Sequence, residues 1–231
     1  MTIKAVIFDL DGTIAAFNLD YKSVRAEVRG FLLNAGVPAS VITVYEPIFE
    51  MLKKAELFMN NAGKTAIGIE EIRRGALQIT EKYELEAALS TSLLPGAMDA
   101  LKDLKKKGLK IGLCTINSAN STEQILSRFK LAQYFDAVVP RNQVTKIKPN
   151  PGHYNVVLGS LGVSSAETVV VGDSITDMQS ASEIKAIAVG IPTGVSTQEQ
   201  LVNQGANYII TSITDLSILI ECINKVQNAS V

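Results

Sequence analysis

Residues 5–13 read AVIFDLDGT, an apolar run that passes directly into a short acidic segment. Four consecutive apolar residues, two of them β-branched, are typical of a strand that is buried on both faces of a parallel sheet. Asp11-Gly12 is a turn signal, and a glycine at this point permits the chain to leave the strand sharply. The segment therefore predicts a buried strand whose carboxyl end carries Asp9 and Asp11.

Five more apolar runs recur along the chain, each followed by a turn signal and a helical pattern. They are KIGLC at 110–114, AVV at 137–139, TVVVG at 168–172, AIAV at 186–189 and YII at 208–210. The helices expected around them span residues 97–107, 122–129, 152–161, 177–183, 197–204 and 215–226. Because strands and helices alternate from Leu94 onward, we predict an α/β fold with a doubly wound parallel, Rossmann-like sheet.

Residues 16–93 interrupt this alternation. Helical spacing over 21–34, 39–60 and 69–89 predicts an all-helical insert. We therefore expect two domains: an α/β core of residues 1–15 and 94–231, and a helical cap domain of residues 16–93. An insert directly after the first strand is expected to lie over the ligand-binding edge of the sheet, where it would act as a lid.

The composition is that of an ordinary globular protein, with a formal net charge of -1. This balance gives no reason to expect nucleic acid or a membrane as a partner. The apolar run before Asp9 is too short for a signal peptide or a membrane span, so we expect a cytoplasmic protein. Cys114 and Cys222 lie in apolar runs, where we expect them to be buried, and two cysteines form no disulfide framework.

Acidic side chains follow two of the predicted strands. Asp9 and Asp11 follow the first strand, and Asp173 and Asp177 follow TVVVG. Because the carboxyl ends of parallel strands meet along one edge of the sheet, these carboxylates are expected to converge. They would repel one another without a cation, and an all-oxygen set of ligands suits Mg²⁺. The sequence thus predicts a magnesium site.

Two further polar residues lie at the same predicted edge. Thr115 follows the 110–114 strand, and Lys148 lies in the loop before the 152–161 helix. A lysine supplies positive charge to a phosphate, and a threonine supplies a hydroxyl donor to its oxygens. Each residue alone has an ordinary explanation, as a loop lysine or a strand residue. In combination with the carboxylates they provide the nucleophile, proton donor, metal site and anion clamp that phosphoryl transfer needs.

Four motifs in this order resemble those of the haloacid dehalogenase superfamily. VIFDLDGT at 6–13 matches the first motif, and VGDSITD at 171–177 resembles the fourth. LCT at 113–115 and KPNP at 148–151 resemble the second and third. With its helical insert after the first motif, the sequence is similar to the phosphoglycolate phosphatase-like branch, and the similarity spans nearly the whole chain.

The resemblance implies catalytic roles for the first motif. Asp9 would attack phosphorus and form an aspartyl-phosphate, and Asp11 would protonate the leaving alcohol and then activate the hydrolytic water. The implied cofactor is Mg²⁺, bound by the side chains of Asp9 and Asp173 and by the backbone carbonyl of Asp11.

The other motifs are implied to bind the substrate. Thr115 and Lys148 would hold the phosphoryl group, with Asn117 as a further contact, and Asp177 would orient Lys148 or a metal-bound water from behind. One departure is that Ile116 separates Thr115 from Asn117, whereas the commonest family form has asparagine directly after the threonine. Residues 15–18, AAFN, also depart from the family pattern, which leaves the substrate open.

We therefore expect a magnesium-dependent phosphatase that hydrolyses a small phosphorylated metabolite, phosphoglycolate-like or a sugar phosphate. Its physiological substrate and oligomeric state stay open. One alternative is a phosphomutase of the β-phosphoglucomutase type, which also has both aspartates of the first motif. Another is a non-catalytic binding domain on the same fold, which would be expected to have lost Asp9 or Asp11. The single histidine, His153, is expected to be a structural residue at the start of a helix.

Overall fold

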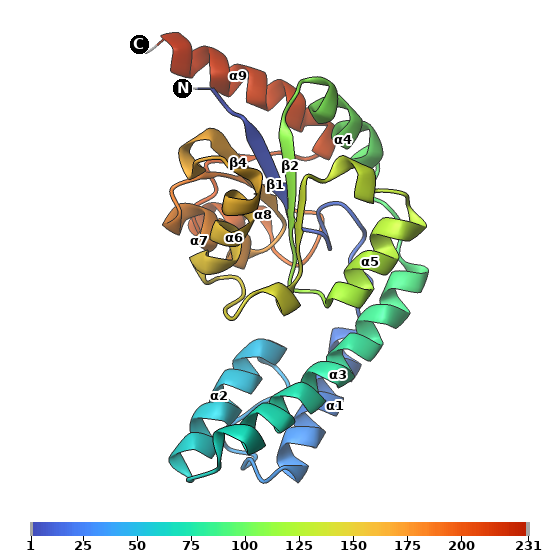
Figure 1. Ribbon diagram of the computed structural model, residues 1–231, viewed down its shortest axis with the longest axis vertical. Helices are drawn as coiled ribbons and strands as arrows, with labels where there is room; N and C mark the ends of the chain where they lie inside the picture. The colour runs from blue at the N-terminus through green and yellow to red at the C-terminus, as the bar shows by residue number, and fades with distance from the viewer. Residues whose placement is uncertain (1, 230–231) are drawn as a thin grey trace. The chain divides into compact units, whose positions relative to one another are not determined.

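The chain folds as two units in a computed structural model that describes residues 2–229. One unit consists of Met1–Asn18 together with Ser90–Val231, and the other of Leu19–Leu89. The first contains the strands, and the second contains helices and loops (Figure 1).

Six parallel strands form a single sheet in the first unit. They are β1 (Ala5–Phe8), β2 (Lys110–Cys114), β3 (Ala137–Val139), β4 (Thr168–Gly172), β5 (Ile187–Gly190) and β6 (Tyr208–Ile209). Their order in the sheet is β3-β2-β1-β4-β5-β6, and neighbouring strands are parallel throughout. The predicted doubly wound α/β fold is confirmed. The run at 186–189 begins and ends one residue before the observed β5, and the run at 208–210 extends one residue beyond β6.

The order reverses at the centre of the sheet. From β1 the chain continues to β2 and β3 on one side and then returns to β4, β5 and β6 on the other. Phe8, the last residue of β1, lies opposite Leu113 of β2 and Val171 of β4. The three central strands therefore end nearly level, at the position where doubly wound sheets bind ligands.

Helices cover both faces of the sheet (Figure 1). They are α4 (Ala97–Lys106), α5 (Ala119–Arg128), α6 (Pro151–Leu161), α7 (Ile175–Glu183), α8 (Gln198–Asn203) and α9 (Leu216–Ala229). Single turns of 3₁₀ helix are η1 (Ala132–Tyr134), η2 (Arg141–Gln143), η3 (Ser165–Glu167) and η4 (Ile213–Asp215). In Figure 1, α6, α7 and α8 lie to one side of the strands and α4 and α5 to the other.

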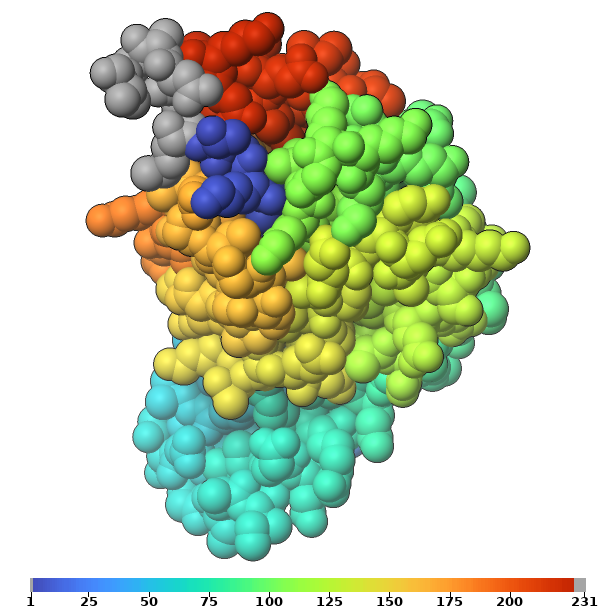
Figure 2. Space-filling view, turned by 45° about the horizontal axis from the view of Figure 1, so that its top comes forward, coloured from blue at the N-terminus to red at the C-terminus, as the bar shows by residue number. Residues whose placement is uncertain are grey.

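The core of this unit is apolar on both faces of the sheet. Every residue of β1 and β4 is buried, as expected for central parallel strands. A Cβ on Gly112 of β2 would lie 2.5 Å from Cγ1 of Val157, so the absence of a side chain lets α6 approach closely. Helix α9 packs on α4, and Asn224 Oδ1 accepts a hydrogen bond of 2.8 Å from Ile3 N. Figure 2 shows α9 in red beside the blue start of the chain.

The second unit is built from α1 (Tyr21–Asn34), α2 (Ile48–Asn61) and most of α3 (Ala66–Ser90). Its own hydrophobic cluster includes Val24, Val28 and Leu32, which follow one another every fourth residue on α1. Gly75 of α3 allows close packing here as well, because a Cβ at this position would lie 2.5 Å from the ring of Phe31.

One predicted helix of the insert was too long. Helix α2 begins at Ile48 and not at residue 39, and residues 39–47 form a loop with short turns. The run Val41-Ile42-Thr43-Val44 is β-branched, and Pro47 is the N-cap of α2, so the local sequence disfavours an earlier helix. Arg29 Nε donates to Ile42 O at 3.2 Å and holds this loop in place.

The prediction for the cysteines was right for one and wrong for the other. Cys114 is buried at the end of β2, whereas Cys222 is exposed. The inner face of α9 is set by Leu216, Ile220 and Ile223, and Cys222 points away from it. Among the described residues, no helix has the length and apolarity needed to cross a membrane.

Candidate active site

Three buried carboxylates meet at the carboxyl ends of the central strands. Ligand oxygens of Asp9, Asp173 and Asp177 all lie within 4.8 Å of one another. Asp9 directly follows β1 and Asp173 directly follows β4, and the parallel register of these neighbouring strands brings the two side chains to the same level. Asp177 lies in the first turn of α7. The register of β1 and β4 thus places Asp9 beside Asp173, and the first turn of α7 adds Asp177 to them.

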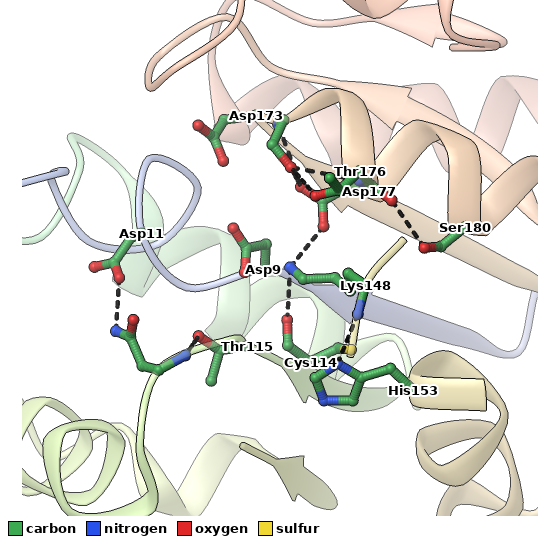
Figure 3. A network of polar contacts seen from close by, with 12 residues as sticks. Asp9, Asp11, Cys114, Thr115, Lys148, His153, Asp173, Thr176, Asp177 and Ser180 are labelled. Atoms are coloured by element: carbon green, nitrogen blue, oxygen red, sulfur yellow. Dashed lines mark hydrogen bonds and ion pairs between the residues drawn. The ribbon is translucent and has the colours of Figure 1, made fainter. Parts of the chain in front are cut away.

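Lys148 ties the cluster to a third strand. Its Nζ lies 2.7 Å from Asp9 Oδ1 and 2.6 Å from Asp177 Oδ1, and it donates to the backbone carbonyl of Cys114 at 3.1 Å (Figure 3). An ammonium has three donors, and all three are used here. The lysine is buried, so it is held as a fixed positive charge beside Asp9.

Both oxygens of Asp177 accept hydrogen bonds from the protein. Oδ1 also accepts from the hydroxyl of Tyr154 at 2.8 Å, and Oδ2 accepts from Ser174 Oγ at 2.5 Å and from Ser174 N at 3.2 Å. Ser174 and Asp177 form the capping box of α7. Asp177 therefore accepts a hydrogen bond from Lys148 and caps the start of α7. Because its oxygens are occupied in this way, Asp9 and Asp173 are the carboxylates better able to accept a metal ion.

A second group lies on the opposite side of Asp9. Asp11 and Lys148 flank Asp9 in Figure 3. The side-chain amide of Asn117 donates to Asp11 Oδ2 at 2.6 Å, and Asn117 N donates to Thr115 Oγ1 at 3.1 Å. Asp11 is half-buried, whereas Thr115 and Asn117 are buried. The structure thus brings all the sequence-predicted site residues to this edge of the sheet.

Burial and like charges raise the pKa values of the two central carboxyl groups. Burial is the main cause that raises the pKa of Asp9 to about 6, against the opposing effect of the Lys148 ammonium. Burial, followed by the charges of Asp9 and Asp177, raises the pKa of Asp173 to about 8. Burial lowers the pKa of Lys148, but the charges of Asp177 and Asp9 outweigh it and the net pKa is raised.

The charges of the cluster fit a divalent cation. When all three carboxyl groups are ionised, they leave two negative charges in excess of the Lys148 ammonium in a buried place. The donors are all oxygen, the ligand type that Mg²⁺ prefers. The residues present therefore fit this ion, and the side chains of Asp9 and Asp173 would hold it.

The loop after β5 also shapes the site, which the sequence analysis missed. Val195 N donates to Asp173 Oδ2 at 2.8 Å. A Cβ on Gly194 would lie 1.9 Å from the same oxygen, and a Cβ on Gly12 would lie 2.6 Å from it. Gly12 also has a φ of 75°, a conformation that favours glycine. The carboxylate of Asp173 therefore packs directly against the backbone at Gly12 and Gly194, where any larger residue would collide with it.

His153 lies behind the site. It is fully buried, its Nε2 lies 3.1 Å from Val139 O, and its Nδ1 accepts from Lys148 N at 3.4 Å. Burial, followed by the charge of Lys148, lowers the pKa of His153 to about 4. A neutral ring with Nε2 protonated satisfies both contacts, so His153 supports the Lys148 loop from within the core.

Buried carboxylates around a lysine at the switch point of a doubly wound sheet are typical of α/β enzymes that bind small anionic ligands. The sequence model of the haloacid dehalogenase-like hydrolases matches residues 3–185. The chain therefore belongs to this family of hydrolases.

Known proteins agree with this assignment. The chain is similar to the phosphoglycolate phosphatase of Shigella boydii, with 28% identity over 230 residues, covering 93% of this chain and 91% of that protein. It is also similar to phosphoglycolate phosphatase 1 of Pseudomonas aeruginosa, with 26% identity over 92% of this chain and 78% of that protein. A solved hydrolase from Pseudomonas syringae superposes with a TM-score of 0.69 and 25% identity, covering 95% of this chain and 99% of that structure.

Proposed function

We propose that the protein is a Mg²⁺-dependent phosphatase that hydrolyses a small phosphate monoester through an aspartyl-phosphate on Asp9. The observation that carries this proposal is the position of Asp9, which shares a buried cluster with Asp173 and lies 2.7 Å from Lys148 Nζ. The membership of the hydrolase family and the phosphatase names of its relatives support the same reaction.

In the first step the carboxylate of Asp9 attacks phosphorus, the ester P–O bond breaks, and Asp11 gives its proton to the departing alcohol. In the second step water attacks the aspartyl-phosphate, Asp11 takes up the proton, and phosphate leaves Asp9 in its original form. The hydroxyl of Thr115 would donate to the phosphoryl oxygens, and the positive charge of Lys148, whose three donors are taken up within the protein, would attract these oxygens electrostatically. When bound by Asp9, Asp173 and the Asp11 carbonyl, Mg²⁺ supplies positive charge to the transferring group.

The substrate belongs to the class of small phosphorylated metabolites, phosphoglycolate-like or a sugar phosphate. The names of the relatives favour phosphoglycolate among these. We further propose that the helical unit Leu19–Leu89 is the cap domain that chooses the substrate, and that the protein works in the cytoplasm.

A panel of phosphorylated metabolites tests this proposal. We expect release of inorganic phosphate with Mg²⁺, none with EDTA, and loss of turnover in Asp9→Asn with an unchanged circular dichroism spectrum. A rate that is independent of metal, or a fully active Asp9→Asn, would contradict the mechanism. A rearranged sugar phosphate without phosphate release would identify a phosphomutase in its place.

A further inference from the structure

The amide of Asn117 and the carboxylate of Asp11 form a direct contact that phosphate binding by Asn117 does not explain. Asn117 Nδ2 donates to Asp11 Oδ2 at 2.6 Å. We propose that Asn117 is a positioning residue for Asp11: it fixes the carboxyl group that moves the proton, and it does not bind the phosphoryl group. This inference rests on the proposed phosphatase function and assigns one more residue to it.

The backbone around Asn117 is held firmly enough for such a task. Asn117 N donates to Thr115 Oγ1, and Asn117 O accepts from Arg141 N at 3.1 Å. The guanidinium of Arg141 donates to Ile116 O at 2.9 Å. Arg141 is itself only 6% exposed, and Asn117 is 7% exposed. A buried arginine of η2 thus fixes the loop that presents the amide to Asp11.

Asp11 needs such a restraint more than Asp9 does. Asp9 is buried and paired with Lys148, whereas Asp11 is half-buried on a loop that turns at Gly12. A carboxyl group has several accessible rotamers on such a loop, and proton transfer requires a well-aligned donor within hydrogen-bond reach. The hydrogen bond that the fixed amide of Asn117 donates to Asp11 Oδ2 favours one of these orientations.

The two assignments of Asn117 predict different dependence on the leaving group. An alkyl alcohol is a poor leaving group that needs a proton from Asp11, whereas 4-nitrophenolate leaves without one. If Asn117 acts through Asp11, its loss slows the first step for alkyl phosphates and leaves nitrophenyl phosphate nearly unaffected. If Asn117 binds phosphate, its loss slows both substrates equally.

Single-turnover kinetics with Mg²⁺ separate these cases, using an alkyl phosphate accepted by the wild type and 4-nitrophenyl phosphate. We expect Asn117→Ala, which removes the donor to Asp11, to slow alkyl ester cleavage about a hundredfold. The single-turnover rate of nitrophenolate release should change less than about threefold, because nitrophenolate leaves without a proton from a general acid. The matched control is Asn142→Ala, whose Oδ1 accepts from Ala119 N at 2.8 Å and supports the start of α5 without touching Asp11. This control should leave both rates unchanged.

Equal losses on the two substrates would overturn the positioning role, as would the same selective loss in Asn142→Ala. A wild-type protein that cleaves neither substrate would instead overturn the proposed phosphatase function. These outcomes are distinguishable because the positioning role is judged only on the ratio of the two rates, and the function on the wild type alone.

Discussion

His153 shows how a single buried side chain makes stability depend on pH. Its pKa of about 4 in the folded protein lies below the ordinary value of 6.5, because burial and the Lys148 charge oppose protonation. As the pH falls between these two values, His153 becomes protonated in the unfolded chain while it stays neutral in the folded protein. The contribution of His153 is therefore fully present above pH 6.5 and is lost as the pH falls toward 4, to a total of about 3 kcal/mol.

The measurement is the free energy of unfolding in urea of the wild type and of His153→Gln at intervals between pH 7 and pH 4. The wild type should lose stability relative to the variant as the pH falls. The comparison is needed because Asp9 and Asp173 act with the opposite sign, since their folded pKa values are raised. Parallel curves for the two proteins would show that His153 is protonated without penalty.

The positions of the candidate site residues could be predicted where a side chain follows a strand. Asp9, Thr115 and Asp173 each come directly after an apolar run, and that location is visible in one sequence. Tyr154 and Arg141 give no such signal, because each acts through a contact with a residue more than twenty positions away. Their partners become neighbours only through the order of the strands.

At the scale of elements, the close contact between the loop after β5 and Asp173 lets us predict the effect of a substitution at Gly194 on Mg²⁺ binding. A Cβ at this position would lie 1.9 Å from Asp173 Oδ2, so Gly194→Ala must displace either the carboxylate or the loop. We expect this variant to lose at least about tenfold in apparent Mg²⁺ affinity, as changes around metal-binding carboxylates commonly do. A Mg²⁺ titration of phosphate release measures this effect.

Gly159 offers the matched control for the same substitution. It lies within α6, and a Cβ there would meet no atom within 4 Å. Gly159→Ala should leave the Mg²⁺ titration unchanged and raise the free energy of unfolding by about 0.5–1 kcal/mol, because alanine favours a helix interior. An unchanged titration in Gly194→Ala would contradict the prediction, because it would show that Mg²⁺ binding does not depend on the position of Asp173 Oδ2.

The elements themselves were predictable to the extent that local sequence decides them. The runs at 5–8, 110–114, 137–139 and 168–172 coincide with strands because each is short and mainly apolar, and the runs at 5–8 and 168–172 form central strands that are buried along their whole length. The start of α2 was wrong by nine residues, since the apolar pattern of 39–47 fits a loop that Arg29 and Glu46 hold by hydrogen bonds. Strand order was not predicted, because pairing between β1 and β4 joins residues that are far apart in the chain.

At the scale of the whole molecule, the chain leaves the unit that contains the sheet after Asn18, forms the helical unit, and returns to the sheet-containing unit at Ser90. The helical unit that it forms in between has its own hydrophobic cluster, separate from that of the sheet. The observed unit begins three residues later and ends four residues earlier than the expected domain of residues 16–93. The observed boundary falls at the last residues of α3, between Leu89 and Ser90, whereas the expected boundary at residue 93 lies beyond the end of this helix.

The carboxylate cluster connects this fold to the proposed metal ion. Without a cation, the folded core keeps three buried carboxylates beside one lysine. Asp173 has a pKa of about 8 in place of 3.8, so the folded state binds its proton more tightly than the unfolded chain does. Stability therefore falls as the pH rises from about 4 to about 8, because over this range the unfolded chain releases the proton that folded Asp173 keeps. A bound Mg²⁺ would reverse this effect, because it favours the ionised carboxylate.

We therefore expect Mg²⁺ to raise the thermal unfolding temperature of the wild type at pH 8 relative to EDTA. At a hundred times its dissociation constant the ion adds about 2.7 kcal/mol if it binds only the folded state. Asp173→Asn should be more stable than the wild type in EDTA, since it removes one buried charge, and should lose most of the response to Mg²⁺. Asp99→Asn, at an exposed position of α4, is the control and should respond as the wild type does. An equal Mg²⁺ shift in Asp173→Asn and the wild type would place the ion away from this cluster, since a site formed by Asp9 and Asp173 cannot bind it unchanged after one of its two carboxylates is neutralised.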